Sequence, residues 1–184
     1  PLPVGLAEIR WAVDHGAREI DIVIFREQVL KQEWQALYDE IAAMREACGE
    51  AHLKTILATG DLKTLRNVYK ASMVAMQAGA DFIKTSTGKE DVNATLPVSL
   101  TMVRALRDYG EQTGHKIGFK PAGGLRTAKD AMNWLILMKE ELGRRWLEPD
   151  LFRIGASSLL ADIERQLEHH VTERYAALSH HAPA

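Results

Sequence analysis

The sequence contains a single cysteine, Cys48, and it has no apolar run approaching the ~20 residues that a membrane-spanning helix needs. One cysteine excludes an internal disulfide and a cysteine-rich metal site, and it fits a reducing, cytoplasmic setting. Residues 1–5 have neither the basic nor the apolar region of a secretory signal. We therefore expect a protein that does not associate with membranes.

An excess of charge of one sign is also lacking, since 23 Lys and Arg residues nearly balance 25 Asp and Glu residues along the chain. This balance argues against a nucleic-acid partner or an anionic membrane surface. Neither a Walker phosphate loop nor a Gly-x-Gly-x-x-Gly fingerprint occurs, so nothing supports nucleotide binding. The pairs His169-His170 and His180-His181 lack metal-site spacing and are interpreted as parts of a solvated, flexible tail of about residues 170–184.

What the chain does contain is a regular alternation of strand and helix patterns over one domain, residues 1–184, of which 46% are hydrophobic. Five short segments rich in β-branched residues are each predicted as a strand. Their starts lie about 29 to 35 residues apart, which is the length of one strand with its crossover helix, so parallel pairing is expected. The predicted strands are residues 19–24, 52–58, 81–85, 116–120 and 151–154.

The segments between the strands carry helical signals. Apolar residues recur at three- and four-residue spacing, for example from Leu65 to Met76, and a leading helix is predicted at about Leu6 to His15. Asp61 and Thr127 are predicted as N-caps of the helices that follow them. Glycines that tolerate the left-handed conformation at a helix end stand just before four of the strands, at Gly16, Gly49, Gly79 and Gly114.

Repeated βα units form either an open doubly wound sheet or a closed (β/α)8 TIM barrel, and the period alone does not choose between them. A complete barrel takes about 250 residues, so about five units and a leading helix fall short of it by roughly three units. The chain is therefore either an open sheet or a fragment that begins inside a barrel and contains its last five units.

Two predicted strands end in lysine, at Lys84 and at Lys120. The carboxyl ends of parallel strands meet at one end of the fold, so the two amines are expected to converge there. An amine is a nucleophile only when it is neutral, and burial together with a neighbouring ammonium favours the neutral form. The pair predicts Schiff-base chemistry; the alternative is two unrelated lysines that extend to water.

A carboxylate interrupts the first apolar strand at Asp21, and a buried carboxylate needs partners. Asp21 can pair with Lys120 for structure alone, relay protons during carbon–carbon cleavage, or do both. Lys54 on the second strand can extend this network. Three glycine-containing turns after the later strands suit a phosphate. The candidate phosphate residues are Gly88, Lys89, Gly123, Gly124, Gly155, Ser157 and Ser158.

Three strings of the sequence resemble those of the deoxyribose-phosphate aldolase family. They are Asp81 to Lys89, Gly118 to Gly124, and Gly155 to Leu160. Weaker similarity covers nearly the whole chain and is nearest to animal members. The resemblance implies a (β/α)8 barrel and a class I aldolase without metal or cofactor, which interconverts 2-deoxy-D-ribose 5-phosphate with D-glyceraldehyde 3-phosphate and acetaldehyde.

By the matching motif positions, Lys84 would be the Schiff-base lysine, Lys120 the lysine that tunes it, and Asp21 the proton-transfer partner. Family members begin with three further strands, so the resemblance also implies a chain truncated at its N-terminus. Two alternatives remain: a lysine-dependent aldolase for another phosphorylated aldehyde, and an inactive homologue that only binds a sugar phosphate or a partner chain. A homo-oligomer is compatible with the sequence.

Overall fold

The computed structural model describes residues 1–177 and shows a parallel sheet covered by helices on one face. Four strands follow one another in the order β1-β2-β3-β4, and all neighbouring pairs are parallel. The predicted α/β class and parallel pairing are confirmed. The strands are β1 (Glu19–Val23), β2 (His52–Ile56), β3 (Phe82–Lys84) and β4 (Gly118–Lys120).

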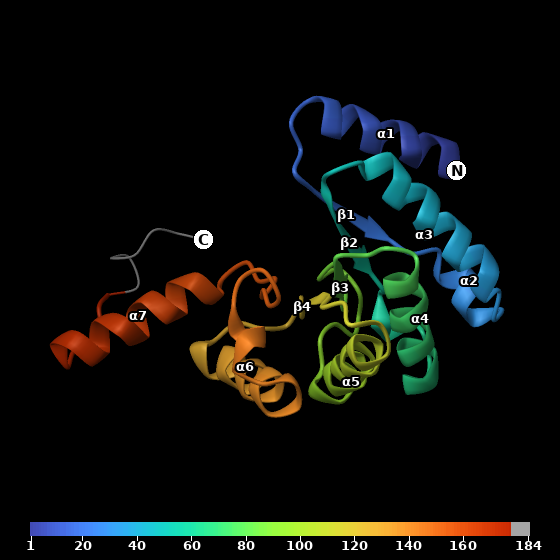
Figure 1. Ribbon diagram of the computed structural model, residues 1–184. Helices are drawn as coiled ribbons and strands as arrows, with labels where there is room; N and C mark the ends of the chain where they lie inside the picture. Colours follow the sequence, from blue (N-terminus) through green and yellow to red (C-terminus); the bar gives the residue numbers. More distant parts are fainter. Residues whose placement is uncertain (178–184) are drawn as a thin grey trace.

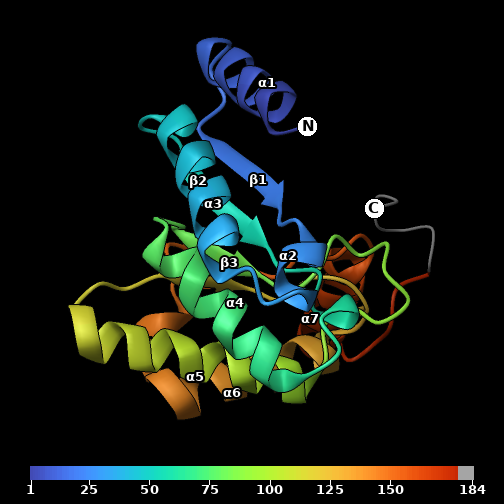
Figure 2. The same ribbon diagram turned by 90° about the vertical axis from the view of Figure 1, so that its right-hand side faces the viewer.

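The helices form an arc around the outer face of the sheet, and the inner face is open in Figure 1. Helices α3, α4 and α5 cover the outer face, as the turned view of Figure 2 also shows, whereas α7 extends away from the body. The helices are α1 (Leu2–Asp14), α2 (Arg26–Leu30), α3 (Trp34–Cys48), α4 (Leu65–Gln77), α5 (Leu96–Thr113), α6 (Ala128–Leu142) and α7 (Leu159–Thr172), with short 3-10 turns η1 (Thr59–Asp61) and η2 (Arg144–Leu147).

The predicted fifth strand, residues 151–154, is wrong as a continuous strand. This segment pairs with β4 and the residues after it only through two isolated bridges, Phe119 with Phe152 and Ala122 with Gly155. Pro121 lies between the two bridges on the β4 side and has no N–H group to donate to the ladder. The segment therefore keeps the parallel position of a fifth strand, but its hydrogen-bond ladder is interrupted.

Two helix starts were predicted from capping residues, and one of them is correct. Thr127 caps α6, and its side chain accepts from the backbone N–H of Asp130 in a reciprocal capping box. Asp61 does not cap α4. It ends the 3-10 turn η1, and Thr64 is the cap instead, with its hydroxyl accepting from Asn67.

The other helix boundaries differ from the predictions in two places. Helix α1 starts at Leu2 rather than near Leu6, because Pro3 falls in its first turn, where a missing N–H costs nothing. Helix α7 runs to Thr172 and so includes the pair His169-His170, which was expected in the tail. The pair His180-His181 lies outside the described residues.

The core lies between the sheet and the helices. Leu53, Ile83 and Phe119 from three successive strands are fully buried and join one cluster with helix residues such as Met102 and Met138. Because side chains alternate across a strand, the residue that follows each of these three along its strand points to the opposite, inner face. In the part of the chain that the structure describes, no helix is long and apolar enough to span a membrane.

Candidate active site

Lys84 and Lys120 lie side by side on the inner face of the sheet. They are the last residues of β3 and β4 and are direct partners in the register of these strands. Register partners on neighbouring strands point to the same side. Their side chains are only 12% and 20% exposed. The structure thus brings together the two amines that the sequence placed at strand ends.

Asp21 of β1 is the carboxylate that connects the lysines. Its Oδ2 atom accepts a hydrogen bond from Lys84 Nζ at 2.8 Å and lies 3.5 Å from Lys120 Nζ. Its Oδ1 atom accepts from Lys54 Nζ at 2.9 Å, and Lys54 is the register partner of Asp21 on β2. The Asp21–Lys120 pairing considered from the sequence is therefore the longest of three contacts.

Two charged residues that the sequence reasoning did not single out complete this network. Glu19 Oε2 lies 2.8 Å from Lys54 Nζ, and Glu19 Oε1 accepts from Arg153 Nη1 at 2.6 Å. The signal for Glu19 was available, because it precedes Asp21 by two residues on a strand and so shares its face. Arg153 lies in the fifth predicted segment, one residue after the bridge to β4.

The network is strongly ionised and carries more cations than anions. Burial alone would raise the pKa of Asp21, but hydrogen bonds from Lys84 and Lys54 lower it to about 2. Hydrogen bonds from Lys54 and Arg153 lower the pKa of Glu19 to about 2 as well. Four basic side chains thus surround two carboxylates that are ionised at neutral pH. This surplus of positive charge favours an anionic substrate.

Lys120 differs from an ordinary surface lysine. Burial is the main cause that lowers its pKa, the ammonium groups of Lys84 and Lys54 add to this, and the Asp21 carboxylate opposes it. A lysine of this kind exchanges a proton closer to neutral pH than a solvated lysine does. Lys120 is therefore suited to proton transfer.

The three glycine-containing turns proposed for phosphate are neighbours in space. A Cβ atom built on Gly88 would lie 3.8 Å from the Cα atom of Gly123, and Gly123 N donates to Gly155 O at 3.1 Å. Gly88, Gly123 and Gly124 all have positive φ angles, between 82° and 88°. A side chain at these positions would strain the backbone, which accounts for the glycines.

The loop of residues 86–94 packs closely against two glycines, Gly123 and Gly60. A Cβ atom on Gly123 would come within 2.6 Å of the Asn93 side chain, and one on Gly60 would overlap the Val92 carbonyl oxygen. Ser86 Oγ donates to Asn93 Oδ1 at 2.9 Å, which ties the two ends of the loop together. The loop after β3 is thus held by close backbone packing.

Within this loop, the Thr87–Lys89 turn already holds an anion from the chain itself. The Glu90 carboxylate accepts from the backbone N–H groups of Thr87 at 3.0 Å and Lys89 at 3.2 Å. Burial would raise the pKa of Glu90, but these hydrogen bonds outweigh it and lower the value. The backbone donors that the sequence assigned to a phosphate at Lys89 are therefore engaged by Glu90.

Two helix starts lie next to the remaining turns. Ser158 precedes α7 as its N-cap residue without a side-chain cap bond, and Ser157 beside it is exposed. Asp162, in the first turn of α7, accepts from the backbone N–H of Ala128 at the start of α6 at 2.7 Å. Helix N-termini favour anions, but the start of α6 is already engaged by Asp162. The Gly123-Gly124 turn and the start of α7 therefore remain the candidate phosphate position.

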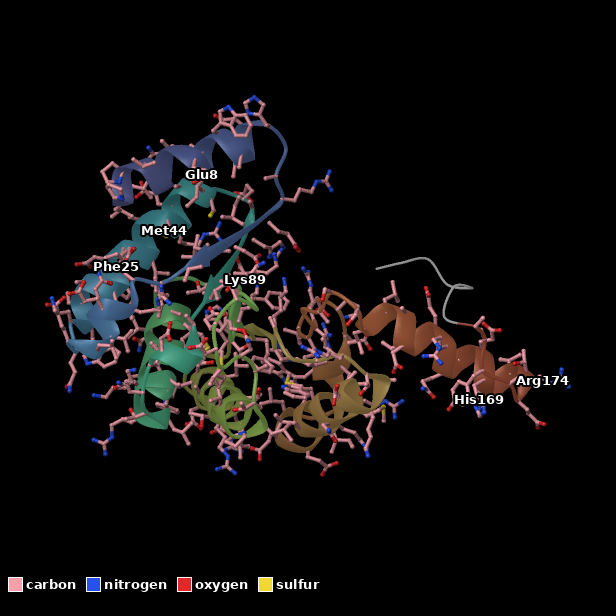
Figure 3. The ribbon with its side chains drawn as sticks, turned by 180° about the vertical axis from the view of Figure 1, so that it is seen from behind. Glu8, Phe25, Met44, Lys89, His169 and Arg174 are labelled. Atoms are coloured by element: carbon pink, nitrogen blue, oxygen red, sulfur yellow. The ribbon has the colours of Figure 1, made fainter. Side chains whose placement is uncertain are left out.

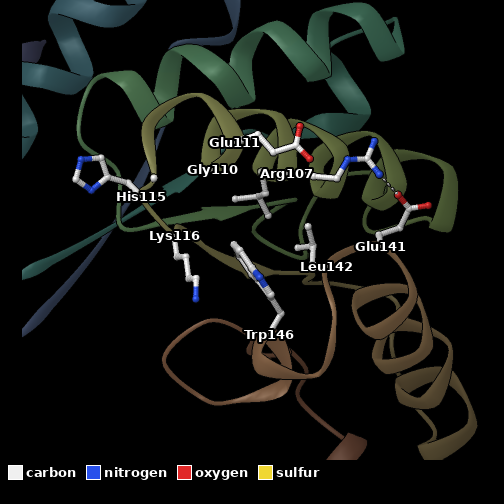
Figure 4. Close-up of a pocket in the computed structure, with 10 residues that line it drawn as sticks. Arg107, Gly110, Glu111, His115, Lys116, Glu141, Leu142 and Trp146 are labelled. Carbon is white, nitrogen blue, oxygen red and sulfur yellow. Dashed lines mark hydrogen bonds and ion pairs between the residues drawn. The ribbon is translucent and has the colours of Figure 1, made fainter.

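A separate pocket of about 370 Å³ lies at the opposite end of the strands (Figure 4). His115 and Lys116, just before β4, line it together with Trp146 and the ion pair between Arg107 and Glu141, 3.1 Å apart. In parallel β/α folds the amino ends of the strands serve stability and the carboxyl ends carry chemistry. The Lys84 end of the strands is therefore the candidate active site.

Comparisons with known proteins identify the family of the chain. The sequence pattern of the family described as "DeoC/LacD family aldolase" matches residues 2–165. The chain belongs to the DeoC/LacD aldolase family. Deoxyribose-phosphate aldolase from Homo sapiens is 69% identical over 176 residues, and that from Bos taurus is 68% identical over the same length. Both matches cover 96% of this chain and 55% of the relative, so the chain spans about half of these proteins.

Solved aldolase structures extend the match to the fold. The structure titled "QR15, an Aldolase" superposes with a TM-score of 0.74 at 28% identity, covering 95% of this chain and 70% of the other. The deoxyribose phosphate aldolase from Aeropyrum pernix, described as tetrameric, gives 0.68 at 25% identity and covers 95% and 64%. The four parallel strands match aldolases of the TIM-barrel type over part of their length, as the family membership leads one to expect.

Proposed function

We propose that this chain carries the catalytic half of a class I deoxyribose-phosphate aldolase. The observation that supports this most is that Lys84 and Lys120 lie side by side at the carboxyl ends of two parallel strands. The Asp21 carboxylate contacts both of their amines. The substrate pair proposed is 2-deoxy-D-ribose 5-phosphate on one side, and D-glyceraldehyde 3-phosphate with acetaldehyde on the other. The names of the relatives support this choice.

In the proposed reaction, neutral Lys84 Nζ attacks the C1 aldehyde of the open-chain sugar, and the carbinolamine loses water to give an iminium. A base takes the proton of the C3 hydroxyl, the C2–C3 bond breaks, and its electron pair moves into the iminium to form an enamine. Glyceraldehyde 3-phosphate leaves. Protonation of the enamine at C2 and hydrolysis then release acetaldehyde and the free amine. Lys120 and Asp21 are the groups proposed to move these protons.

Reduction with borohydride in the presence of acetaldehyde tests this function directly. A Schiff base on Lys84 would be fixed as a secondary amine that carries an ethyl group, and mass spectrometry of the peptide containing residues 81–89 would show it. Reaction with excess borohydride but no aldehyde is the control. A chain that folds but gains no ethyl group at any lysine would contradict the proposal.

The phosphate is proposed to bind at Gly123-Gly124 and at residues 155–158, and Gly124→Ala tests this position. Gly124 has a φ of +87°, and an added Cβ atom meets nothing within 4 Å. The substitution therefore strains the backbone by about 1 kcal/mol without a clash. We expect Kd for the sugar phosphate, measured by calorimetry, to rise at least about tenfold while binding of the unphosphorylated sugar changes little.

Gly114→Ala is the matched control for this prediction. Gly114 ends α5 away from the site, has a φ of +77°, and an added Cβ atom there also meets nothing within 4 Å. Both variants should lose similar stability, and only Gly124→Ala should lose affinity for the phosphate. Equal losses of affinity in the two variants would show that the turn supports the fold and not the anion.

Lys120→Met should change the pH dependence of adduct formation. The pKa of Lys120 is lowered, so its positive charge is present at low pH and is lost as pH rises through that value. Without this charge the cation nearest to the Lys84 amine on β4 no longer repels a proton from it. We expect the rate of adduct formation at pH 7 to fall about tenfold and to recover toward pH 9. A variant with both the parent rate and the parent pH profile would contradict this role.

A second candidate function is binding of a sugar phosphate without turnover. It is favoured by one observation: Asp21 and Glu19, on the inner face of β1, are exposed to solvent. An open site of this kind can bind a sugar phosphate without excluding water well enough for turnover. In that case calorimetry would show phosphate-dependent binding, and borohydride would trap no adduct.

A further inference from the structure

We infer that Arg153 and Glu19 are positioning residues, which keep Lys54 shared between two carboxylates and so orient Asp21 toward Lys84. This inference rests on the proposed function, because it explains how the reacting amine and its carboxylate are held. Neither residue touches Lys84 in the structure. Their action is transmitted through Lys54, whose Nζ atom lies 2.8 Å from Glu19 and 2.9 Å from Asp21.

Arg153 is fixed by three contacts on different parts of the chain. Its Nη1 atom donates to Glu19 Oε1 at 2.6 Å, its Nε atom donates to Pro149 O at 2.9 Å, and its guanidinium lies 4.8 Å from the centre of the Phe82 ring. Glu19 and Arg153 are 134 positions apart, on the first strand and on the segment beside the last strand. The pair therefore reaches across the whole inner face of the sheet.

The two carboxylate oxygens of Glu19 contact different cations. Oε1 faces Arg153 and Oε2 faces Lys54, so each cation takes one oxygen. Lys54 is only 3% exposed and finds its second partner in Asp21 Oδ1, which leaves Asp21 Oδ2 for Lys84. If Arg153 were absent, both oxygens of Glu19 would be available to Lys54. The ammonium would then move toward Glu19, and Asp21 would lose one of its two close partners.

Asp21 has charged neighbours on several elements of the fold. Lys54, Lys84 and Lys120 face it from β2, β3 and β4, and Glu19 shares its strand. On the other side of β1, Glu8 of α1 lines a groove of about 420 Å³ together with Asp21, and Figure 3 labels it on that helix. None of these groups replaces the cation that Arg153 supplies to Glu19.

A cycle of three variants tests the inference: Arg153→Met, Glu19→Gln, and both together. With Arg153→Met, Lys54 is drawn from Asp21, so the carboxylate gains a proton at higher pH. The titration midpoint of Asp21, about 2 in the parent, should move up by about one pH unit. Borohydride-trapped adduct should form about threefold more slowly at neutral pH, because Asp21 is less firmly oriented toward Lys84. In the double variant no competing carboxylate remains for Lys54, so the profile should return toward the parent. Arg145→Met, which breaks an exposed pair with Asp150, is the control for loss of an arginine.

Recovery of the parent behaviour in the double variant separates a positioning role from a role in support of the fold. Urea unfolding of each variant reports stability, and a double variant that is as slow as Arg153→Met, or slower, would overturn the inference. NMR titration of the Asp21 carboxyl carbon gives the same comparison without any substrate. If the parent traps no adduct but the titration shows the shift and its reversal, the positioning is right and the aldolase assignment is wrong. If neither readout moves in Arg153→Met, the positioning is wrong.

Discussion

Replacing Lys84 by Met should abolish the reducible adduct and lower any aldol cleavage below about a thousandth of the parent rate, because a covalent route without its nucleophile has no substitute. Met keeps the length and apolar stem of the side chain and removes only the amine. Lys84 is favoured over its neighbour because it lies 2.8 Å from Asp21, against 3.5 Å for Lys120, and because its side chain is the more buried of the two. Mass spectrometry after borohydride reduction with acetaldehyde measures the loss.

Lys120 is the serious rival for this role, since burial lowers its pKa and its amine is next to the same carboxylate. The control is Lys89→Met, which removes an exposed lysine from the loop after β3. Figure 3 shows Lys89 away from His169 of α7 and from Arg174, which follows that helix. The Lys89 variant should keep the adduct on residue 84. An ethyl group on Lys120 in the Lys84→Met protein would overturn the assignment.

The order of the fold was predictable from the sequence because strand and helix periods alternate along the chain. What could not be predicted was the hydrogen bonding at particular residues. Pro121 interrupts the last ladder, and this becomes visible only when its partner segment is known. Likewise Thr64, and not Asp61, caps α4, because residues 59–61 form a separate 3-10 turn first.

The same limit applies to the site. Strand ends placed Lys84 and Lys120 at one edge of the sheet, since all parallel strands end there. The sequence indicates that Lys54 can extend the network, but its two carboxylate partners depend on the register of β1 against β2. Arg153 was missed because its contact with Glu19 joins segments that are not neighbours in the sheet. Long-range pairs of this kind follow from curvature, which no local pattern encodes.

The open edges of the sheet lead to the second large effect. Strand β1 pairs only with β2, so its other edge has no partner strand in the described residues. A groove of about 420 Å³ runs along that strand beneath α1, and apolar residues such as Ile9 and Ile20 line it. At the other end of the chain, α7 exposes Leu160 and Leu167 by 65% and 60%. Closure of a barrel removes such edges, and leaving them open favours association.

We therefore expect the 184-residue chain alone to associate, and a chain extended at its N-terminus by three βα units to fold cooperatively. The extension can be taken from the human relative, which is 69% identical and of which this chain covers 55%. Because the denaturant m value scales with the surface that unfolding exposes, the extended protein should show a clearly larger m value, and its rate of adduct formation should rise at least about tenfold.

The control for this experiment is the same extension with two prolines in its last strand, which cannot then pair with β1. Light scattering measures association, and urea unfolding followed by circular dichroism measures cooperativity. The extension should act through strand pairing, so the proline variant should behave like the chain alone. A 184-residue chain that is monomeric, unfolds cooperatively and traps the adduct as fast as the extended protein would contradict the prediction. The exposed inner face of β1 would then be compatible with chemistry, and the network of Asp21, Lys54 and Glu19 would be sufficient to hold the site without a closed barrel.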